Sequence, residues 1–320
     1  MIVSYSSEDL RQRTVDMFRQ NYEITTTEPG QAFMFNGLEI QQNLNTGDVS
    51  IIQQNKIDTL HSNLGLSGQS SRVRTPRSKR PLGPPEPPPP GGALTEDQKL
   101  LATINGAITH IARTARPDIA EAASALAPLA RGPTPEHLQA ACQVVEYLKQ
   151  THDRGIVFKS PRPGQDQLRP TVFTDANYEK GIAKTGVLVM LNGGVIHSSS
   201  KIVRRPTCSV TEAEMVGINE GVRFATNLSF ILRDLNLDDH AKQIEVFSDS
   251  KTAVATGNTN TTRTTFGHYL DIVRYTQHQR QEGVVQLKYF KAQDQLADCL
   301  TKPLSGPQFE SAIHKFMHTP

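Results

Sequence analysis

The chain has 320 residues, of which 37% are hydrophobic and 21% are charged, and its formal net charge at pH 7 is +2. This length predicts about two or three folded units, and the near-neutral charge excludes binding of nucleic acid through overall basicity. Three scattered cysteines argue against a disulfide framework and a cysteine-based zinc site, so we expect a reducing compartment. No apolar run is long enough for a membrane span or a signal core. These features predict a soluble intracellular protein, cytoplasmic or nuclear, that is not secreted and has no membrane partner.

Residues 1–66 are expected to form a small αβ unit of one helix and a β-hairpin. Helical spacing begins after Ser7, and a serine followed by two acidic residues is a suitable N-cap. Residues 33–42 and 49–54 alternate between apolar and polar side chains, as strands do. Between them, the sequence NTGD at residues 45–48 predicts a hairpin turn.

Residues 67–93 differ in composition from the sequence around them. A basic cluster, RVRTPRSKR, precedes the proline-rich sequence PLGPPEPPPPGG, which is compatible only with an extended or disordered chain. We interpret this segment as a basic, proline-rich linker. The alternative is a proline-rich ligand for a partner domain.

Residues 94–160 are predicted to form a helical region. Thr95 and Gln98 have capping-box spacing at the start of the first helix, and the sequence RPD at residues 116–118 interrupts the helical pattern and restarts it. A third helix is expected within residues 134–151, with a proline near its start. These helices carry no cluster of catalytic residue types, so we expect them to pack or to connect other units.

From residue 168 onward, apolar strands alternate with helices. The strand PTVFTDANY comes first, and TGVLVMLNGGVIHSSSKI reads as two strands around an Asn-Gly-Gly turn. VRRPTCSV is a candidate for a further strand. A helix is expected from Thr211, followed by the strand QIEVFSDS, more helix, the strand VVQLKYF and the short helical segment DQLADCL. Strands in series followed by crossover helices predict a mixed α/β sheet.

Two glutamates lie in the first turn of the helix that is expected from Thr211. Residues two apart lie on opposite sides of a helix, so Glu212 and Glu214 cannot share a face. Steps of three and four from Glu214 meet apolar residues and glycines, whereas those from Glu212 meet mostly polar ones. We therefore expect Glu214 to face the sheet and Glu212 to face solvent. Because Thr211 and Glu214 have capping-box spacing, helix capping is an alternative role for Glu214.

Three aspartates are expected close to Glu214. Asp175 ends the strand TVFTD, Asp249 ends IEVFSD, and Asp298 lies in DQLADCL, although each could instead cap the turn or helix that follows it. Converging carboxylates without matching lysine or arginine would repel one another, and a divalent cation resolves this repulsion. Oxygen-only ligands suit Mg²⁺ or Mn²⁺. Two such ions can activate water and stabilise a leaving oxygen in phosphodiester cleavage.

Residues 168–317 resemble the ribonuclease H domain of copia-type LTR retrotransposon Pol polyproteins. The matching motifs, in the family's order, are FTDANY, TGVLVMLNGGVIHSSSK, SVTEAEM, VFSDS and DQLADCLTKPL. The resemblance implies a ribonuclease H-like α/β fold, with a mixed five-stranded sheet flanked by helices. It also implies an Mg²⁺-dependent endonuclease that uses two metal ions to cleave the RNA strand of RNA–DNA hybrids. The residues to which it assigns both catalysis and metal binding are Asp175, Glu214, Asp249 and Asp298.

The upstream residues resemble other parts of the same polyproteins. Residues 1–66 are similar to the tail of the reverse transcriptase, as a small αβ remnant, and residues 94–160 are similar to the connection region. The polymerase palm with its aromatic-x-Asp-Asp signature is absent, so we expect a C-terminal fragment without DNA polymerase activity. The resemblance implies a cytoplasmic location in virus-like particles, or a nuclear one. It also implies the rest of a retroelement Pol protein as a partner.

Two sets of residues depart from the family's pattern. Tryptophans that relatives often carry are replaced here by Tyr178 and His197. Some ribonucleases H place a histidine just before the last aspartate to assist product release, and the corresponding sequence, KYFKAQDQLAD, has none.

Contacts with nucleic acid are predicted from local basic residues, because a hybrid is recognised mainly through its backbone and the 2′-hydroxyl. The main candidates are Lys201, Arg204 and Arg205, and the weaker ones are Lys180, Lys184 and Lys251. A solvated basic turn is the alternative interpretation of residues 201–205.

The leading hypothesis is therefore a ribonuclease H that acts during retrotransposon reverse transcription. One alternative is a catalytically idle, retroelement-derived fragment that binds nucleic acid or a protein partner. Another is a processivity or dimerisation subunit for a full-length polymerase. All four carboxylates of the family are present, which favours the enzyme.

Overall fold

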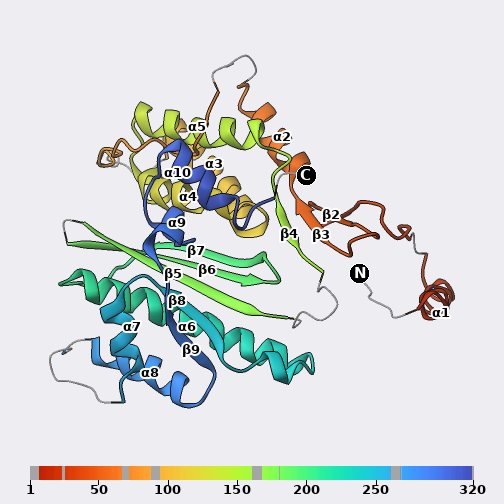
Figure 1. Cartoon of the computed structure of the whole chain (residues 1–320). Helices are drawn as coiled ribbons and strands as arrows, with labels where there is room; N and C mark the ends of the chain where they lie inside the picture. Colours follow the sequence, from red (N-terminus) through yellow and green to blue (C-terminus); the bar gives the residue numbers. More distant parts are fainter. Residues whose placement is uncertain are drawn as a thin grey trace.

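The structure is a computed structural model of the chain, and it describes residues 7–23, 26–66, 72–87, 94–160, 168–179, 181–260, 267 and 269–318. Two sheets organise these residues, one of five strands and one of four (Figure 1). Among the described residues, no helix combines the length and the apolar character needed to cross a membrane.

The five-stranded sheet contains all the strands that the structure describes after residue 160. These strands are β5 (Pro170–Glu179), β6 (Ile182–Leu191), β7 (Gly194–Ile202), β8 (Ile244–Ser248) and β9 (Val285–Tyr289). Their order is β7-β6-β5-β8-β9, in which β7, β6 and β5 are antiparallel neighbours whereas β8 runs parallel to both β5 and β9. The prediction of a mixed five-stranded sheet is confirmed.

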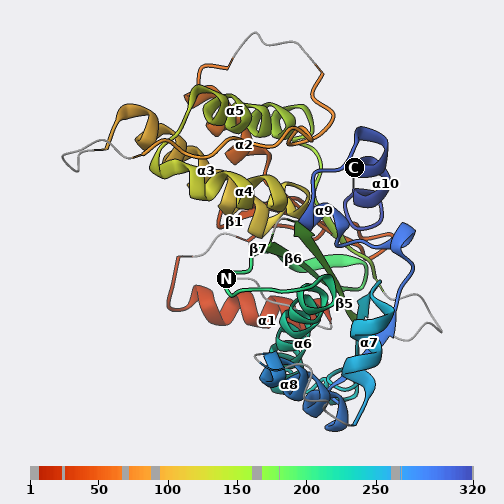
Figure 2. The ribbon, with the colours of Figure 1, turned by 90° about the vertical axis from the view of Figure 1, so that its left-hand side faces the viewer.

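Helices cover both faces of this sheet (Figure 1). One face carries α6 (Val210–Asp234), α7 (Lys251–Asn258) and α8 (Leu270–Gln281). The opposite face carries α3 (Glu96–Thr114), α4 (Ala120–Leu126), α5 (Pro135–Gln150), α9 (Asp298–Thr301) and α10 (Gly306–Ile313). The second view shows the same two layers (Figure 2). Each layer has its own apolar core, and the core on the α3 side joins residues of the helical region to residues of β5, β6 and β7.

The helical region follows the sequence signals closely. Thr95 and Gln98 form the predicted capping box of α3, and α5 begins at Pro135, behind the N-cap Thr134. The short 3₁₀ helices Pro117–Ile119 and Ala127–Arg131 flank α4, as expected where prolines interrupt a helical pattern.

The predicted strand VRRPTCSV is wrong. The chain keeps one strand-like hydrogen bond past β7, from the Val203 N–H to the Ala183 carbonyl, and residues 203–208 then contain no strand. Pro206 cannot donate to a ladder, and the chain must turn here to enter α6.

The N-terminal residues form a separate sheet that needs a strand from the helical region. Its strands are β1 (Phe33–Phe35), β2 (Leu38–Gln42), β3 (Val49–Ile52) and β4 (Ile156–Phe158), all antiparallel. The helices on either side of β1–β3 are α1 (Glu8–Arg19), which Ser7 caps as expected, and α2 (Gln54–Asn63). Since β4 completes this sheet, residues 1–66 do not form it alone. The division of the chain into domains stays a prediction.

One predicted strand is in fact a hairpin. Residues 33–42 divide into β1 and β2 at Asn36 and Gly37, whose φ angles are 51° and 77°. Both values are positive, as a two-residue hairpin turn requires, and Asn-Gly is the preferred sequence for such a turn. The apolar alternation of this segment concealed a turn signal that the sequence carries.

Residues 72–87 lie in the predicted linker and contain no helix or strand, in keeping with an extended chain. They are nevertheless held along the helical region by hydrogen bonds. The bonded pairs are Val73 with Gln150, Thr75 with Gln143, Arg77 with Glu121, Gly83 with His137, and Glu86 with Gly132. The other residues of the predicted linker, 67–71 and 88–93, lie outside the described residues.

Gly186 sets the distance between β6 and α9. A Cβ atom at this position would lie 2.8 Å from the Leu300 Cβ and 3.0 Å from the Ala297 carbonyl oxygen. We expect Gly186→Ala to lower the free energy of unfolding by about 1–3 kcal/mol. The new Cβ would clash with a backbone oxygen and another Cβ, which cannot move aside as the end of a flexible side chain can. Urea denaturation followed by circular dichroism measures the change.

The matched control is Gly106→Ala in α3, where a Cβ would meet no neighbouring atom within 4 Å. That substitution is expected to be neutral or to stabilise the protein by about 0.5–1 kcal/mol. Equal effects of the two substitutions would contradict the close packing of α9 on β6.

Candidate metal centre

Two of the four predicted carboxylates meet where β5 and β8 separate. These strands pair only over residues Thr171–Phe173 of β5, so the edge of β5 is open beyond that point. Asp175 lies on this open stretch and is 4% exposed, and Asp249 follows β8 directly and is partly buried. Parallel strands that end at the same edge therefore place both carboxylates on one side of the sheet.

Glu214 reaches the same place from α6. Gly217 lets the helix lie close to β5, since a Cβ there would be 3.3 Å from the Asp175 carbonyl oxygen. The Glu214 carboxylate accepts a hydrogen bond from the backbone N–H of Ala176. One carboxylate oxygen each from Asp175, Glu214 and Asp249 lies within 4.8 Å of the others. The structure thus brings together three of the four predicted residues.

The expectation that Glu212 faces solvent is wrong. The helix begins at Val210 with Ser209 as its N-cap, so Glu212 lies in the third helical position. There its Oε2 accepts a hydrogen bond of 2.8 Å from the Cys208 N–H, and the residue is 1% exposed. Glu212 therefore has the capping role that the sequence had offered to Glu214, and Glu214 is left to face the aspartates.

Asp298 lies beside the cluster and has a cationic partner. It is the first residue of α9, and its Oδ1 is 3.0 Å from the Lys302 Nζ. Asp298 is not within the group of three that share the 4.8 Å limit, but its charge raises the pKa of both Asp175 and Asp249. The expectation of carboxylates without a matching lysine is therefore wrong. The signal was present in the sequence, because residues four apart on a helix are neighbours.

Burial and mutual repulsion make the carboxylates difficult to ionise. Burial, together with the charges of Asp175 and Asp249, raises the pKa of Glu214 to about 9. Burial and Asp298 raise the pKa of Asp175 to about 6, against an opposing hydrogen bond from the Thr301 hydroxyl. The pKa of Asp249 is also raised, mainly by burial.

These features fit a divalent cation. The Glu214 Oε2 is buried and has no hydrogen-bond partner among the described residues. A buried, unpartnered carboxylate oxygen that faces two other carboxylates is costly unless a cation balances it. The oxygen-only ligand set suits a hard cation, and at least Asp175, Glu214 and Asp249 could hold one.

The raised pKa of Glu214 predicts how stability depends on pH without metal. Between pH 4.5 and pH 9 the unfolded chain loses the Glu214 proton while the folded chain keeps it, so this group makes stability fall as pH rises. In EDTA at pH 8, we expect Glu214→Gln to raise the free energy of unfolding by on the order of 3 kcal/mol. The gain should shrink towards pH 4.5. Urea denaturation at several pH values measures it, and a gain that is constant with pH would contradict the pKa assignment.

The predicted nucleic-acid contacts differ in their exposure and in their neighbours. Lys201 and Arg204 are exposed, and the Lys201 ammonium lies 5.7 Å from the centre of the Phe224 ring. Lys251, at the start of α7, is exposed and lies 5.2 Å from the centre of the Tyr289 ring. Arg205 is partly buried in the loop before α6.

Of the weaker candidates, Lys184 forms an ion pair within the protein, and Lys180 lies outside the described residues. The Lys184 Nζ is 2.8 Å from the Glu121 Oε1, and its side chain is 13% exposed. Lys184 therefore joins β6 to α4 and is not available for nucleic acid.

Tyr178 and His197, at the two positions where relatives often carry tryptophan, each contact a neighbouring residue. The Tyr178 hydroxyl donates to the Thr207 carbonyl at 3.0 Å. The His197 ring lies 4.0 Å, centre to centre, from that of Phe224, and burial lowers the pKa of His197 to about 4. His197 is therefore a neutral packing residue at neutral pH.

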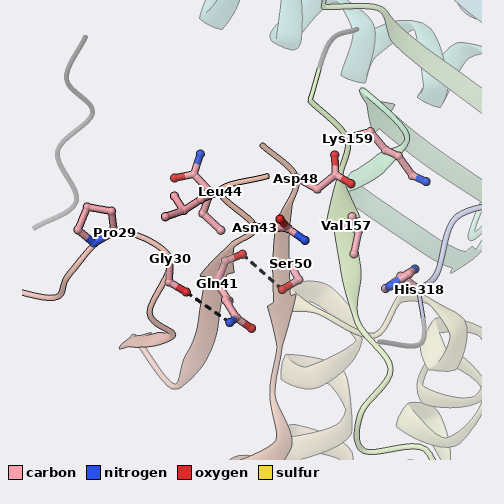
Figure 3. Close-up of a pocket in the computed structure, with 11 residues that line it drawn as sticks. Pro29, Gly30, Gln41, Asn43, Leu44, Asp48, Ser50, Val157, Lys159 and His318 are labelled. Atoms are coloured by element: carbon pink, nitrogen blue, oxygen red, sulfur yellow. Dashed lines mark hydrogen bonds between the residues drawn. The ribbon is translucent and has the colours of Figure 1, made fainter. Parts of the chain in front are cut away.

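None of the four predicted carboxylates lines the cavity beside the N-terminal sheet. The cavity has a volume of about 530 Å³ and lies against the four-stranded sheet (Figure 3). Its lining residues include Asp48, Lys159 and His318, and hydrogen bonds join Gln41 to Gly30 and to Ser50. The Asp48 carboxylate also accepts a hydrogen bond from the Ser160 N–H. The lining mixes charges of both signs with amides, and it does not gather ligands for a metal ion.

Solved structures similar to this chain are reverse transcriptases and ribonuclease H domains. A foamy viral protease-reverse transcriptase dRH in complex with double-stranded DNA matches 82% of this chain and 38% of its own, with a TM-score of 0.41 and 14% identity. The N-terminal RNase H domain of a Mycobacterium tuberculosis protein matches 46% of this chain and 98% of its own, with a TM-score of 0.33 and 18% identity.

No protein-family model matches the chain. Among curated proteins, a retrovirus-related Pol polyprotein from transposon RE1 of Arabidopsis thaliana is 27% identical over 245 residues, which is 74% of this chain. The Transposon Ty1-JR2 Gag-Pol polyprotein of Saccharomyces cerevisiae is 23% identical over 227 residues, or 70% of this chain. The chain spans only 16% and 13% of the length of these relatives. The homologues of this chain are therefore Pol polyproteins of copia/Ty1 retrotransposons, as the sequence motifs had indicated.

Proposed function

We propose that this chain is a metal-dependent ribonuclease H, an endonuclease that cleaves the RNA strand of RNA–DNA hybrids during retrotransposon reverse transcription. The observation that carries the proposal is the convergence of Asp175, Glu214 and Asp249 within 4.8 Å of one another, with an unpartnered Glu214 oxygen. The relationship to retrotransposon Pol polyproteins supports the same function.

Asp175, Glu214, Asp249 and Asp298 are the residues that would hold two Mg²⁺ ions, for which Mn²⁺ could substitute. Bound there, such ions would supply an activated water and stabilisation of the leaving oxygen. Thr301 would orient Asp175 through its hydroxyl, and the N–H of Ala176 would orient Glu214. Because all four carboxylates are partly or fully buried, their positions are set by packing before any ligand binds.

The proposed substrate contacts come from the end of β7, the loop before α6 and the start of α7. Lys201, Arg204, Arg205 and Lys251 are proposed to contact phosphates. Such contacts position a duplex without reading its sequence. Their removal should weaken binding more at low salt than at physiological salt and make binding less salt-dependent, because each phosphate contact releases counterions. As partners and location, we propose the rest of a retroelement Pol protein and an intracellular site, cytoplasmic in virus-like particles or nuclear.

Cleavage of a defined hybrid tests the proposal. The purified chain is incubated with Mg²⁺ and either a hybrid labelled on the RNA strand, the same RNA single-stranded, or a DNA duplex. Cleavage confined to the RNA strand of the hybrid and abolished by EDTA is expected. Binding of the hybrid without cleavage in Mg²⁺ or Mn²⁺ would favour the idle, nucleic-acid-binding fragment instead.

A further inference from the structure

Lys302 is the one lysine that contacts the candidate metal centre among the described residues. It directly follows α9, and its Nζ is 3.0 Å from the Asp298 Oδ1. Its positive charge lowers the pKa of Asp175, Glu214 and Asp249, so its field reaches the whole cluster. Four carboxylates therefore share one built-in cation.

The α9 segment presents two donors to the carboxylates from successive residues. Thr301 donates through its hydroxyl to Asp175, while Lys302 pairs with Asp298. The close approach of α9 to Gly186 holds this segment against β6. The Lys302 side chain is 43% exposed, however, so it has room to leave the pair without unpacking α9.

The pairing has a consequence for Asp298. An oxygen of each of the other three carboxylates lies within 4.8 Å of the others, and Asp298 is outside that group, held by Lys302. A carboxylate whose oxygen accepts from an ammonium has lost a lone pair and much of its charge for a second cation.

We propose that Lys302 is a positioning residue that occupies Asp298 until a divalent cation enters the cluster, so that the ammonium and the cation compete for the same carboxylates. This inference rests on the proposed metal-dependent function and adds a residue that sets the affinity for the ion. In the metal-free chain, Lys302 would reduce repulsion within the cluster. On metal binding it would be displaced towards solvent.

Binding of Mn²⁺ in the absence of nucleic acid tests this role. We expect Lys302→Met, which keeps an unbranched side chain one atom shorter and removes the charge, to lower the dissociation constant for Mn²⁺ about tenfold, measured by the electron paramagnetic resonance of free Mn²⁺. In EDTA the variant should melt at a lower temperature than the parent chain, and saturating Mn²⁺ should reduce this difference. Lys302→Arg keeps the charge and should restore the parental affinity.

Two controls separate this role from general effects of charge and packing. Lys99→Met removes a lysine that is 2.8 Å from Glu96 in the first turn of α3, and it should leave Mn²⁺ affinity unchanged. In a chain that already carries Asp298→Asn, Lys302→Met should change the Mn²⁺ dissociation constant less than about threefold. The carboxylate for which Lys302 and the ion compete is absent from that chain. If Lys302→Met does not fold, Lys302→Gln takes its place.

The outcomes are distinct for the inference and for the proposed function. An unchanged or weaker Mn²⁺ affinity in the folded Lys302 variants would overturn the inference, whether or not the parent chain cleaves hybrid. Tighter binding in a chain that cuts no hybrid would support the role of Lys302 and overturn the proposed function. Absence of Mn²⁺ binding by the parent chain would overturn both.

Discussion

Replacing Asp249 by Asn is expected to reduce hybrid cleavage by about 10²–10⁴-fold while the protein stays folded. The substitution keeps the shape of the side chain and removes one charge from a cluster in which three carboxylates lie within 4.8 Å of one another. Metal binding, water activation and stabilisation of the leaving oxygen all depend on that charge. Because Asp249 follows β8 and is only partly buried, its loss should not disturb the packing of the sheet. Single-turnover cleavage of a labelled hybrid at saturating Mg²⁺ measures the change.

The matched control is Asp239→Asn, which makes the same chemical change at an exposed aspartate in the 3₁₀ helix Asp238–His240. This variant should cleave as the parent chain does. Asp175→Asn should be as damaging as Asp249→Asn, and the double variant should lose little more than either single one, because residues that act as a unit are non-additive. Retention of more than about a tenth of the activity by Asp249→Asn would contradict its assignment as a metal ligand.

Removing the Asp118 carboxylate is expected to cause the largest loss of stability, about 3–5 kcal/mol for Asp118→Ala. Arg116 and Asp118 have fully buried side chains and are joined by two hydrogen bonds of 2.8 and 2.9 Å. The guanidinium also donates to Thr151, and the Tyr147 hydroxyl donates to Asp118 at 2.7 Å. Burial raises the pKa of Asp118, but Arg116 outweighs it and holds the pKa below its usual value. Alanine would leave a buried guanidinium with no counter-charge.

Urea denaturation at pH 7 measures this loss, with Asp9→Ala as the control. Asp9 pairs with Arg13 on the surface of α1, where both side chains are more than 70% exposed, so its removal should cost less than about 1 kcal/mol. A paired replacement, Arg116→Met with Asp118→Leu, should recover much of the stability lost in Asp118→Ala, because it buries no unpaired charge. A loss below about 1 kcal/mol for Asp118→Ala would show that the network contributes little.

Much of the fold from residue 94 onward follows from local sequence signals. The strands β5, β6 and β7 are long, apolar and separated by strong turn sequences, and α3 and α5 carry their own caps. The four candidate carboxylates were identified because each lies in a short motif at the end of a strand or in a helical segment. Local signals succeed here because hydrogen bonds between near neighbours determine caps and turns.

Other features could have been read from the sequence and were missed. Asn36 and Gly37 form a turn whose sequence is among the clearest hairpin signals, but it lay within a run that alternates as a single strand would. Lys302 lies four residues after Asp298, at the spacing of helical neighbours. The prediction that Glu212 faces solvent assumes a helix that starts at Thr211. The helix starts at Val210 instead, and Glu212 is a buried residue that caps its first turn.

Local sequence patterns predict the types of residue at the candidate site, the elements that carry them and the mixed sheet to which they belong. Only the tertiary structure decided that β5 and β8 separate after Phe173, that Gly217 brings α6 against β5, and that Glu214 is left with an unpartnered oxygen. It also decided that β4 completes the N-terminal sheet, more than a hundred residues after β3 in the chain. The physical reason is the same in each case. These contacts join residues far apart in sequence, and their geometry depends on packing that no local pattern encodes.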